Sequence, residues 1–193
     1  MISLEFPDGS KHEYEEGITA LDVITKDIGE GLARVAVAAK VNDDVIDLTR
    51  TITTSGTFQV LTFKDDEGKE VFRHSAAHVL AIALRRVFPD SKLTIGPAID
   101  DGFYYDIDSE DAFTPKDFEK IEKKMKEIVD KDLPIEREDI SKEEAKKLFS
   151  GNEYKIELID ELDDDTVSVY KQGDFVDLCR GPHVPSTGKI KAF

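Results

Sequence analysis

Hydrophobic and polar residues alternate on both sides of Asp8-Gly9, a dipeptide typical of tight hairpin turns, so the chain begins with two predicted antiparallel strands. Residues 19–29 then repeat apolar side chains at helical spacing. A second hairpin is predicted around Asn42-Asp43-Asp44, and residues 58–63 predict one more strand. A hairpin, a helix and further strands, in this order, are typical of a small β-grasp (ubiquitin-like) domain, which we place at residues 1–63.

The pattern changes after this domain. Residues 64–70 are polar and include a glycine, which predicts a short linker. Residues 72–88 are apolar on almost every helical face, so they predict a long buried helix. Thr114-Pro115 predicts the start of an amphipathic helix, and the last strands are predicted around the turn at Gln172-Gly173-Asp174. Residues 64–193 are therefore expected to form an α+β domain, with the long helix against a mainly antiparallel sheet.

Composition narrows the class of protein. The chain has 193 residues and a formal net charge of −16, which by itself argues against a broad nucleic-acid-binding surface. The single cysteine excludes an internal disulfide and favours a reducing compartment. There is no apolar run of membrane-spanning length and no signal-like N-terminus, so we expect a cytoplasmic protein without a membrane partner.

The candidate chemistry lies in two short motifs. His74 and His78 form HxxxH in the apolar helix, and the sole cysteine, Cys179, forms CxxxH with His183. Four nitrogen and sulfur groups fit a tetrahedral zinc site, and the same groups without metal fit general acid–base chemistry. Cys179 as a nucleophile is a further alternative, and two satisfied core histidines are the plainest one. Asp177 stands two residues before Cys179 on the same predicted strand face.

Three longer stretches resemble one family. These are "RHSAAHVLAIALRRVFP", "IGPAIDDGFYYDID" and "VDLCRGPHVP". They resemble the editing domain of threonyl-tRNA synthetases, and the first sixty residues resemble the TGS domain that precedes it. Editing proteins for alanyl-tRNA share the HxxxH and CxxxH frame, but the TGS unit and "GFYYDI" favour the threonyl branch. No GxxxxGK[ST] loop is present, which sets nucleotide hydrolysis aside.

The resemblance implies a hydrolase that removes serine wrongly attached to threonine tRNA and spares threonyl-tRNA. His74 would position or activate water, with Lys155 nearby; on its own sequence context, Lys155 is a solvent-facing strand lysine. Asp177 would meet the amino group of the substrate, and Tyr105 with Gly96 and Pro97 would shape the pocket wall. The implied catalytic residues are His74, His78, Lys155, Cys179 and His183.

The resemblance also sets expectations for cofactors and partners. No metal is expected to be required, although zinc at His74, His78, Cys179 and His183 stays open. ATP and a further zinc are expected only with the aminoacylation domain of such a synthetase, of which this chain would be the N-terminal region. Expected partners are mischarged tRNA(Thr), the other synthetase domains and a second copy of the full-length enzyme.

Two other functions remain open. A freestanding zinc-dependent aminoacyl-tRNA hydrolase would lose activity when its metal is removed. For a non-catalytic module that binds RNA or protein, substitution of His74 and Lys155 would cause no loss of activity.

Overall fold

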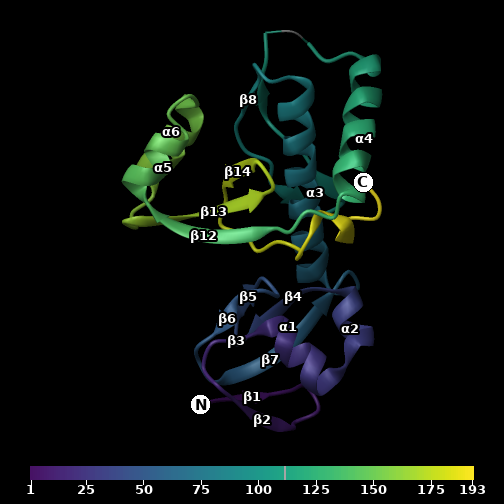
Figure 1. The fold of residues 1–193 in the computed structure, drawn as a ribbon, viewed down its shortest axis with the longest axis vertical. Coiled ribbons are helices and arrows are strands. Elements are labelled where there is room, and N and C mark those ends of the chain that lie inside the picture. Colours follow the sequence, from purple (N-terminus) through teal and green to yellow (C-terminus); the bar gives the residue numbers. More distant parts are fainter. Residues whose placement is uncertain (111) are drawn as a thin grey trace. The chain divides into compact units, whose positions relative to one another are not determined.

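The computed structural model describes residues 1–110 and 112–193, and Figure 1 draws its helices and strands. The chain divides into two compact units, each with a sheet of its own. The first unit comprises Met1–Phe72 with Gly181–Pro185, and the second comprises Arg73–Arg180 with Ser186–Phe193.

Five strands of the first unit form a mixed sheet in the order β2-β1-β7-β4-β5. Strands β1 and β7 pair in parallel, and the other neighbours pair antiparallel. The strands are β1 (Ile2–Glu5), β2 (Lys11–Tyr14), β4 (Ala36–Val41), β5 (Asp44–Ile46) and β7 (Gly56–Thr62), with a separate pair of β3 (Ile18–Thr19) and β6 (Thr51–Ile52). A parallel central pair between two hairpins is the β-grasp arrangement, so the predicted fold of this unit is confirmed.

A helical segment packs on this sheet. Helix α1 (Ala20–Val23) begins after Thr19, whose side chain caps it, and continues as a π-helical turn, η1 (Ile24–Ile28). The turn ends at Gly29, whose φ of 118° is a conformation that glycine adopts readily, and α2 (Glu30–Val35) follows. Apolar side chains of α1 and η1 join the buried strand residues in one hydrophobic core. This core stabilises the first unit and contains none of the candidate site residues.

The long helix α3 (Asp66–Val87) begins earlier than the sequence pattern indicates. Residues 64–70 were predicted as a linker, and this prediction is wrong, because most of them form the first turn of α3. The reason is local packing: a Cβ on Gly68 would lie only 2.0 Å from the carbonyl oxygen of Thr62, at the end of β7. Because glycine has no Cβ, α3 can begin directly against the end of β7. Gly68 therefore serves a close contact between two elements and does not mark a linker.

The second unit is α+β, as predicted. Its largest sheet is antiparallel, in the order β12-β13-β14, and two further antiparallel pairs join β8 to β11 and β9 to β10. The strands are β8 (Lys92–Leu93), β9 (Ala98–Ile99), β10 (Gly102–Phe103), β11 (Ile107–Asp108), β12 (Glu136–Ser141), β13 (Thr166–Gln172) and β14 (Phe175–Leu178). The helices that follow α3 are α4 (Pro115–Asp130), α5 (Lys142–Leu148) and α6 (Glu153–Glu161), and a 3-10 turn, η2 (Thr187–Lys189), lies near the end.

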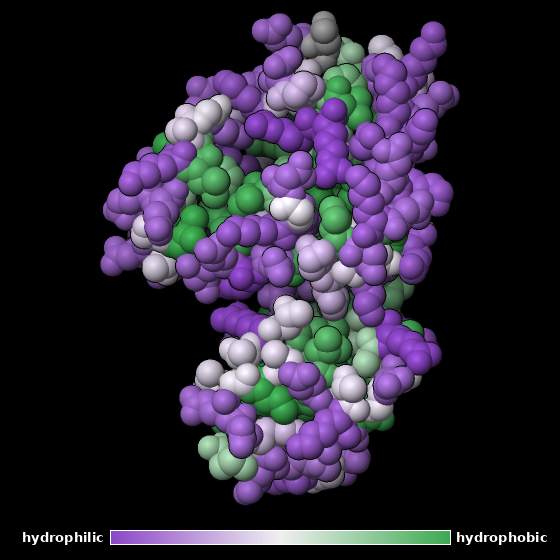
Figure 2. All heavy atoms as spheres, viewed as in Figure 1, coloured by the Kyte–Doolittle hydropathy of each residue, from purple (hydrophilic) through white to green (hydrophobic). Residues whose placement is uncertain are grey.

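Helix α4 shows how the many charged residues are accommodated. It opens at Thr114-Pro115, as predicted, and buries Ile121, Met125 and Ile128 on one side. Hydrophilic residues cover its other side, as Figure 2 shows for the face in view. Within residues 1–110 and 112–193, none of the helices has the length and apolar character needed to cross a bilayer.

The close approach at Gly68 generates a prediction about stability. Alanine normally stabilises a helix relative to glycine by about 0.5–1 kcal/mol, and Gly31→Ala in α2, where a Cβ would meet no atom within 4 Å, should show this gain. Gly68→Ala should instead lower the free energy of unfolding by roughly 1–3 kcal/mol, because its Cβ overlaps the backbone of Thr62. Urea unfolding of both variants measures the difference. Equal stabilisation by the two substitutions would contradict the close packing of Gly68 against Thr62.

Candidate active site

His74 and His78 lie one turn apart on α3 and face the same direction, as their spacing predicts. Their ring centroids are 5.3 Å apart and the rings are nearly perpendicular, at 88°. His78 is only 4% exposed, whereas His74 is half-buried. The helix around them is tightly packed, with Ala77 and Val79 fully buried, so it holds both rings in defined positions.

Cys179 reaches His74 from the end of β14. Its Sγ lies 3.2 Å from His74 Nε2. The backbone at this point is held on both sides by Ser168 of β13, because Cys179 N donates to the Ser168 carbonyl at 3.2 Å and Ser168 Oγ donates to the Cys179 carbonyl at 2.6 Å. Two residues 105 positions apart in sequence are therefore in direct contact.

The predicted site residues fall in both units. His74, His78 and Cys179 belong to the second unit, and one ligand atom of each lies within 4.8 Å of the others, whereas His183 belongs to the first unit, in the segment Gly181–Pro185. His183 is 1% exposed, and its backbone N–H donates to Asp47 Oδ1 at 2.8 Å in the first unit. The predicted convergence is confirmed for the HxxxH motif and Cys179, which together form a possible metal site.

Lys155 is not the solvent-facing strand lysine that its sequence context indicates. It lies in the first turn of α6, where Asn152 caps the helix by accepting from Lys155 N at 3.3 Å. Its side chain is 5% exposed, and Nζ lies 2.8 Å from Oδ1 of Asp177 on β14, whose side chain is 6% exposed. A lysine is almost never this buried without a charged partner, and Asp177 is that partner.

Asp177 has further donors besides Lys155. The hydroxyl of Tyr105 donates to Oδ2 at 3.2 Å, and the backbone N–H of Leu178 donates to Oδ1 at 2.9 Å. Burial and the neighbouring carboxylate raise the pKa of Tyr105 far above its usual value, so this hydroxyl keeps its proton and acts as a donor. An amino group of a substrate would therefore have to share Asp177 with these groups or displace one of them.

Gly96 lies against the ring of Tyr105. A Cβ at Gly96 would lie 2.2 Å from Tyr105 Cδ2, so glycine is required if the ring is to keep this position. Pro97 follows and is half-buried. The structure thus brings Gly96 to Tyr105 and Tyr105 to Asp177.

Gln172 was missed by the sequence reasoning, which assigned it only to a turn. It is the last residue of β13 and is fully buried, and its Nε2 lies 3.1 Å from His78 Nδ1. Its Oε1 has no hydrogen-bond partner among the described residues. A polar residue beside a glycine turn gives no signal of burial in the sequence, because the contact with His78 joins positions 94 apart.

The contact with Gln172 determines how His78 holds its proton. Burial first, and then the nearby charges of His74 and Lys155, lower the pKa of His78 well below its usual value, so the ring is neutral. An amide nitrogen only donates, so Nδ1 of His78 must accept, and the ring proton then lies on Nε2. The donor groups of His74, His78 and Cys179 fit zinc by type and proximity, but this hydrogen bond leaves neither nitrogen of His78 with a free lone pair for a metal.

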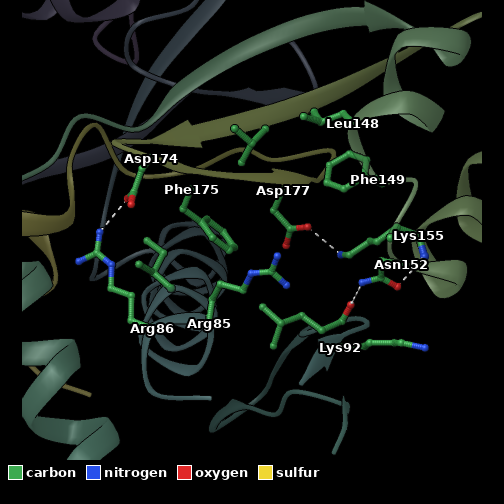
Figure 3. Close-up of a pocket in the computed structure, with 14 residues that line it drawn as sticks. Arg85, Arg86, Lys92, Leu148, Phe149, Asn152, Lys155, Asp174, Phe175 and Asp177 are labelled. Carbon is green, nitrogen blue, oxygen red and sulfur yellow. Dashed lines mark hydrogen bonds and ion pairs between the residues drawn. The ribbon is translucent and has the colours of Figure 1, made fainter. Parts of the chain in front are cut away.

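A cavity of about 320 Å³ adjoins the Lys155–Asp177 ion pair. Figure 3 shows it between the C-terminal turns of α3, the start of α6 and strand β14. Arg85, Arg86 and Lys92 contribute to its lining, and none of them was singled out from the sequence.

Comparison with known proteins agrees with this architecture. Residues 2–62 match the family model of the TGS domain, and residues 167–193 match the model described as the threonyl and alanyl tRNA synthetase second additional domain. The whole chain is 54% identical to the threonine–tRNA ligase of Carboxydothermus hydrogenoformans, 55% identical to that of Syntrophotalea carbinolica and 51% identical to that of Clostridioides difficile.

The chain carries a TGS domain, and its last residues match the second additional domain described for threonyl and alanyl tRNA synthetases. It spans 31% of the length of the first two relatives and 30% of the third. The matched segment 167–193 includes Cys179 and His183 of the candidate site. His74 and His78 lie outside both matched segments, and the contact with Cys179 joins His74 to the matched segment 167–193.

The buried ion pair gives a prediction about stability. Lys155→Met should lower the free energy of unfolding by about 3–5 kcal/mol, because it leaves the carboxylate of Asp177 buried without its counter-charge. Lys92→Met is a matched control: Lys92 also pairs with a carboxylate, that of Glu153, at 2.9 Å, but this pair is exposed and should contribute less than about 1 kcal/mol. Urea unfolding measures both. Similar losses in the two variants would show that the Lys155 pair is as solvated as the surface pair.

The contact between Gln172 and His78 gives a prediction about the proton and about zinc. In the unsubstituted chain, nitrogen-15 NMR should find the His78 proton on Nε2. Gln172→Glu replaces the donor with a carboxylate acceptor, so the proton should move to Nδ1 and zinc affinity should rise by roughly 10–100-fold. Gln59→Glu, at an exposed position on β7, adds the same charge elsewhere and should change neither property. A His78 proton on Nδ1 in the unsubstituted chain would refute the assignment.

Proposed function

We propose that this chain hydrolyses the ester bond of seryl-tRNA(Thr) and spares threonyl-tRNA(Thr). The observation that carries the proposal is the convergence of His74, His78 and Cys179 at one point, in a chain whose relatives are named threonine–tRNA ligases. The division into a TGS domain at residues 1–63 and an editing domain at residues 64–193 is part of the same proposal.

In this mechanism His74 takes a proton from the attacking water. Its contact with Cys179, at 3.2 Å, orients the imidazole, and a positioned histidine suits this task near neutral pH. Water then attacks the ester carbonyl, the carbon–oxygen bond to the ribose breaks, and His74 returns the proton to the ribose oxygen that leaves. His78, neutral and protonated on Nε2, supplies an N–H donor for the developing oxyanion.

Lys155 and Asp177 contribute electrostatics and position in the proposal. The buried ammonium of Lys155 stabilises negative charge nearby, since a charge in a dry environment acts over a longer range than in water. Asp177, which accepts from Tyr105, is the carboxylate available to the amino group of the substrate. His183, the fourth residue of the two motifs, is proposed to complete the site.

Selectivity for serine over threonine is a steric matter in this proposal. One methyl group changes binding by only about 1–3 kcal/mol, so a synthesis site that accepts threonine also admits serine, and a second site must remove the smaller product. That general logic of synthetase editing is established for other synthetases. Tyr105, held against Gly96 and by Asp177, is the rigid wall that we propose excludes the extra methyl group.

We propose that no metal takes part. The support is the hydrogen bond from Gln172, which occupies Nδ1 of His78 and leaves the proton on Nε2. If zinc were bound, His74, His78, Cys179 and His183 would hold it, and it would supply a Lewis acid. A zinc-dependent aminoacyl-tRNA hydrolase is the second candidate function, and the proximity of the donor groups of His74, His78 and Cys179 is the observation that favours it.

The wider context is also a proposal. Because the chain spans about 31% of the length of its relatives, we propose that it acts beside the other domains of a threonyl-tRNA synthetase, with ATP and a further zinc confined to those domains. Threonine tRNA and a second copy of the enzyme are the proposed partners.

Deacylation of labelled seryl-tRNA(Thr) tests this function directly. His74→Ala should lower the rate by about 10²–10⁴-fold, the usual contribution of a general base, and a chelator should leave the unsubstituted chain unaffected. His12→Ala is the matched control, because His12 lies on β2 in the first unit and its removal should not change the rate. Full activity of His74→Ala would exclude the proposed role, and loss of activity with the chelator would favour the zinc-dependent alternative.

A further inference from the structure

The segment Gly181–Pro185 belongs to the first unit, although the residues before and after it belong to the second. It is well buried, since His183 is 1% exposed and Val184 is fully buried. The first unit therefore consists of the TGS sequence, a few residues that follow it and one short, distant piece of chain. That piece carries His183, the residue proposed to complete the reaction site.

Both ends of this segment are held within the second unit. Before it, Cys179 is joined to Ser168 on β13 by two hydrogen bonds. After it, Thr187 N donates to the Leu133 carbonyl at 2.9 Å, and Thr187 Oγ1 donates to the Ile128 carbonyl at 2.9 Å. The residues between these anchors form neither helix nor strand, so no ladder of backbone hydrogen bonds fixes them.

Asp47 holds the middle of the segment. It follows β5 directly, is 6% exposed, and accepts from the backbone N–H of His183 at 2.8 Å through Oδ1. Its own position is fixed, because Arg50 N donates to the Asp47 carbonyl at 3.0 Å, and Ile46 and Leu48 on either side are buried. Burial of a carboxylate is costly unless hydrogen bonds compensate it, and the His183 N–H supplies one such bond.

The sequence around the segment is suited to this contact. Gly181 has a φ of 74°, in the left-handed region that favours glycine, so the chain can turn sharply two residues before His183. Asp47 gave no signal in the sequence, because the contact joins positions 136 apart. A carboxylate next to a predicted strand is usually a solvated turn residue, whereas this one is buried on a backbone N–H.

We propose that Asp47 is a positioning residue for His183, and that the first unit thereby takes part in the hydrolysis. The inference rests on the proposed function in one respect, which is the place of His183 in the reaction site. Asp47 touches neither the substrate nor the attacking water. Its carboxylate fixes the main chain at His183, and the imidazole is thereby held in one position, which matters because a displacement of about 1 Å can cost a large factor in rate.

Hydrogen exchange of the full chain, followed by NMR, tests the anchor without requiring hydrolysis. Asp47→Ala should speed exchange of the His183 amide by roughly ten- to hundredfold, because it removes a charged acceptor. Asp47→Asn should have a smaller effect, since its amide oxygen remains a neutral acceptor. Asp44→Ala, which removes an exposed carboxylate from β5, should leave the exchange of this amide unchanged.

Deacylation of seryl-tRNA(Thr) tests the positioning role. Asp47→Ala should lower kcat by roughly ten- to hundredfold, and Asp47→Asn should recover much of this loss. In the His183→Ala background, Asp47→Ala should cause no further loss, because Asp47 acts through the imidazole of His183. An aspartate with a merely structural role would lower the rate in both backgrounds. Asp44→Ala should again have no effect.

Two results would overturn the inference. One is an unchanged exchange rate of the His183 amide in a folded Asp47→Ala variant, or in Asp47→Asn if the alanine variant does not fold. The other is a loss of kcat on substitution of Asp47 that is equally large with and without the His183 imidazole. Because exchange does not depend on deacylation, an inactive chain in which Asp47 still protects the His183 amide would count against the proposed hydrolysis and not against the anchor.

Discussion

The ion pair between Lys155 and Asp177 is the constraint on which the candidate site depends. Removing two charges from water is costly, and their attraction offsets this cost only when further hydrogen bonds satisfy the remaining atoms. Tyr105 and the backbone of Leu178 supply those bonds to the carboxylate. The pair thereby joins α6 to β14, and both of its residues line the cavity. Asp177 also holds Tyr105, whose position requires glycine at position 96. One electrostatic contact therefore fixes a wall of the cavity and the edge of the proposed reaction site.

Burial also determines the chemistry of the neighbouring histidines. His78 is neutral because it is enclosed and because His74 and Lys155 oppose a further positive charge. Gln172 then selects which nitrogen bears its proton, while Cys179 orients His74. His74, His78 and Cys179, whose donor groups resemble part of a zinc site, therefore also take part in hydrogen bonds, one of them to a buried amide. The types of donor group alone would not distinguish a zinc site from a set of hydrogen-bonded groups.

The distribution of charge differs between the surface of the chain and the cavity. The chain is strongly acidic overall, yet the cavity beside the ion pair has more basic than acidic side chains, and Arg85 lacks a partner among the described residues. The acidic surface disfavours broad contact with RNA, whereas the recess favours a single anionic group. The proposed hydrolysis uses this difference, because it requires that only the end of an RNA enters.

The sequence alone determined the types of element and the chemistry that could gather. Alternation around Asp8-Gly9 and the apolar run after Phe72 have local causes, so the β-grasp hairpin and the long helix were predictable, and two spaced motifs were enough to indicate the cluster of histidines and cysteine. Tertiary structure decided the rest. Lys155 lies buried on a helix because Asp177 meets it, Gln172 matters because it reaches a histidine 94 positions away, and α3 starts early because Gly68 packs on Thr62. Each depends on a contact between distant segments, which neither periodicity nor local propensity encodes.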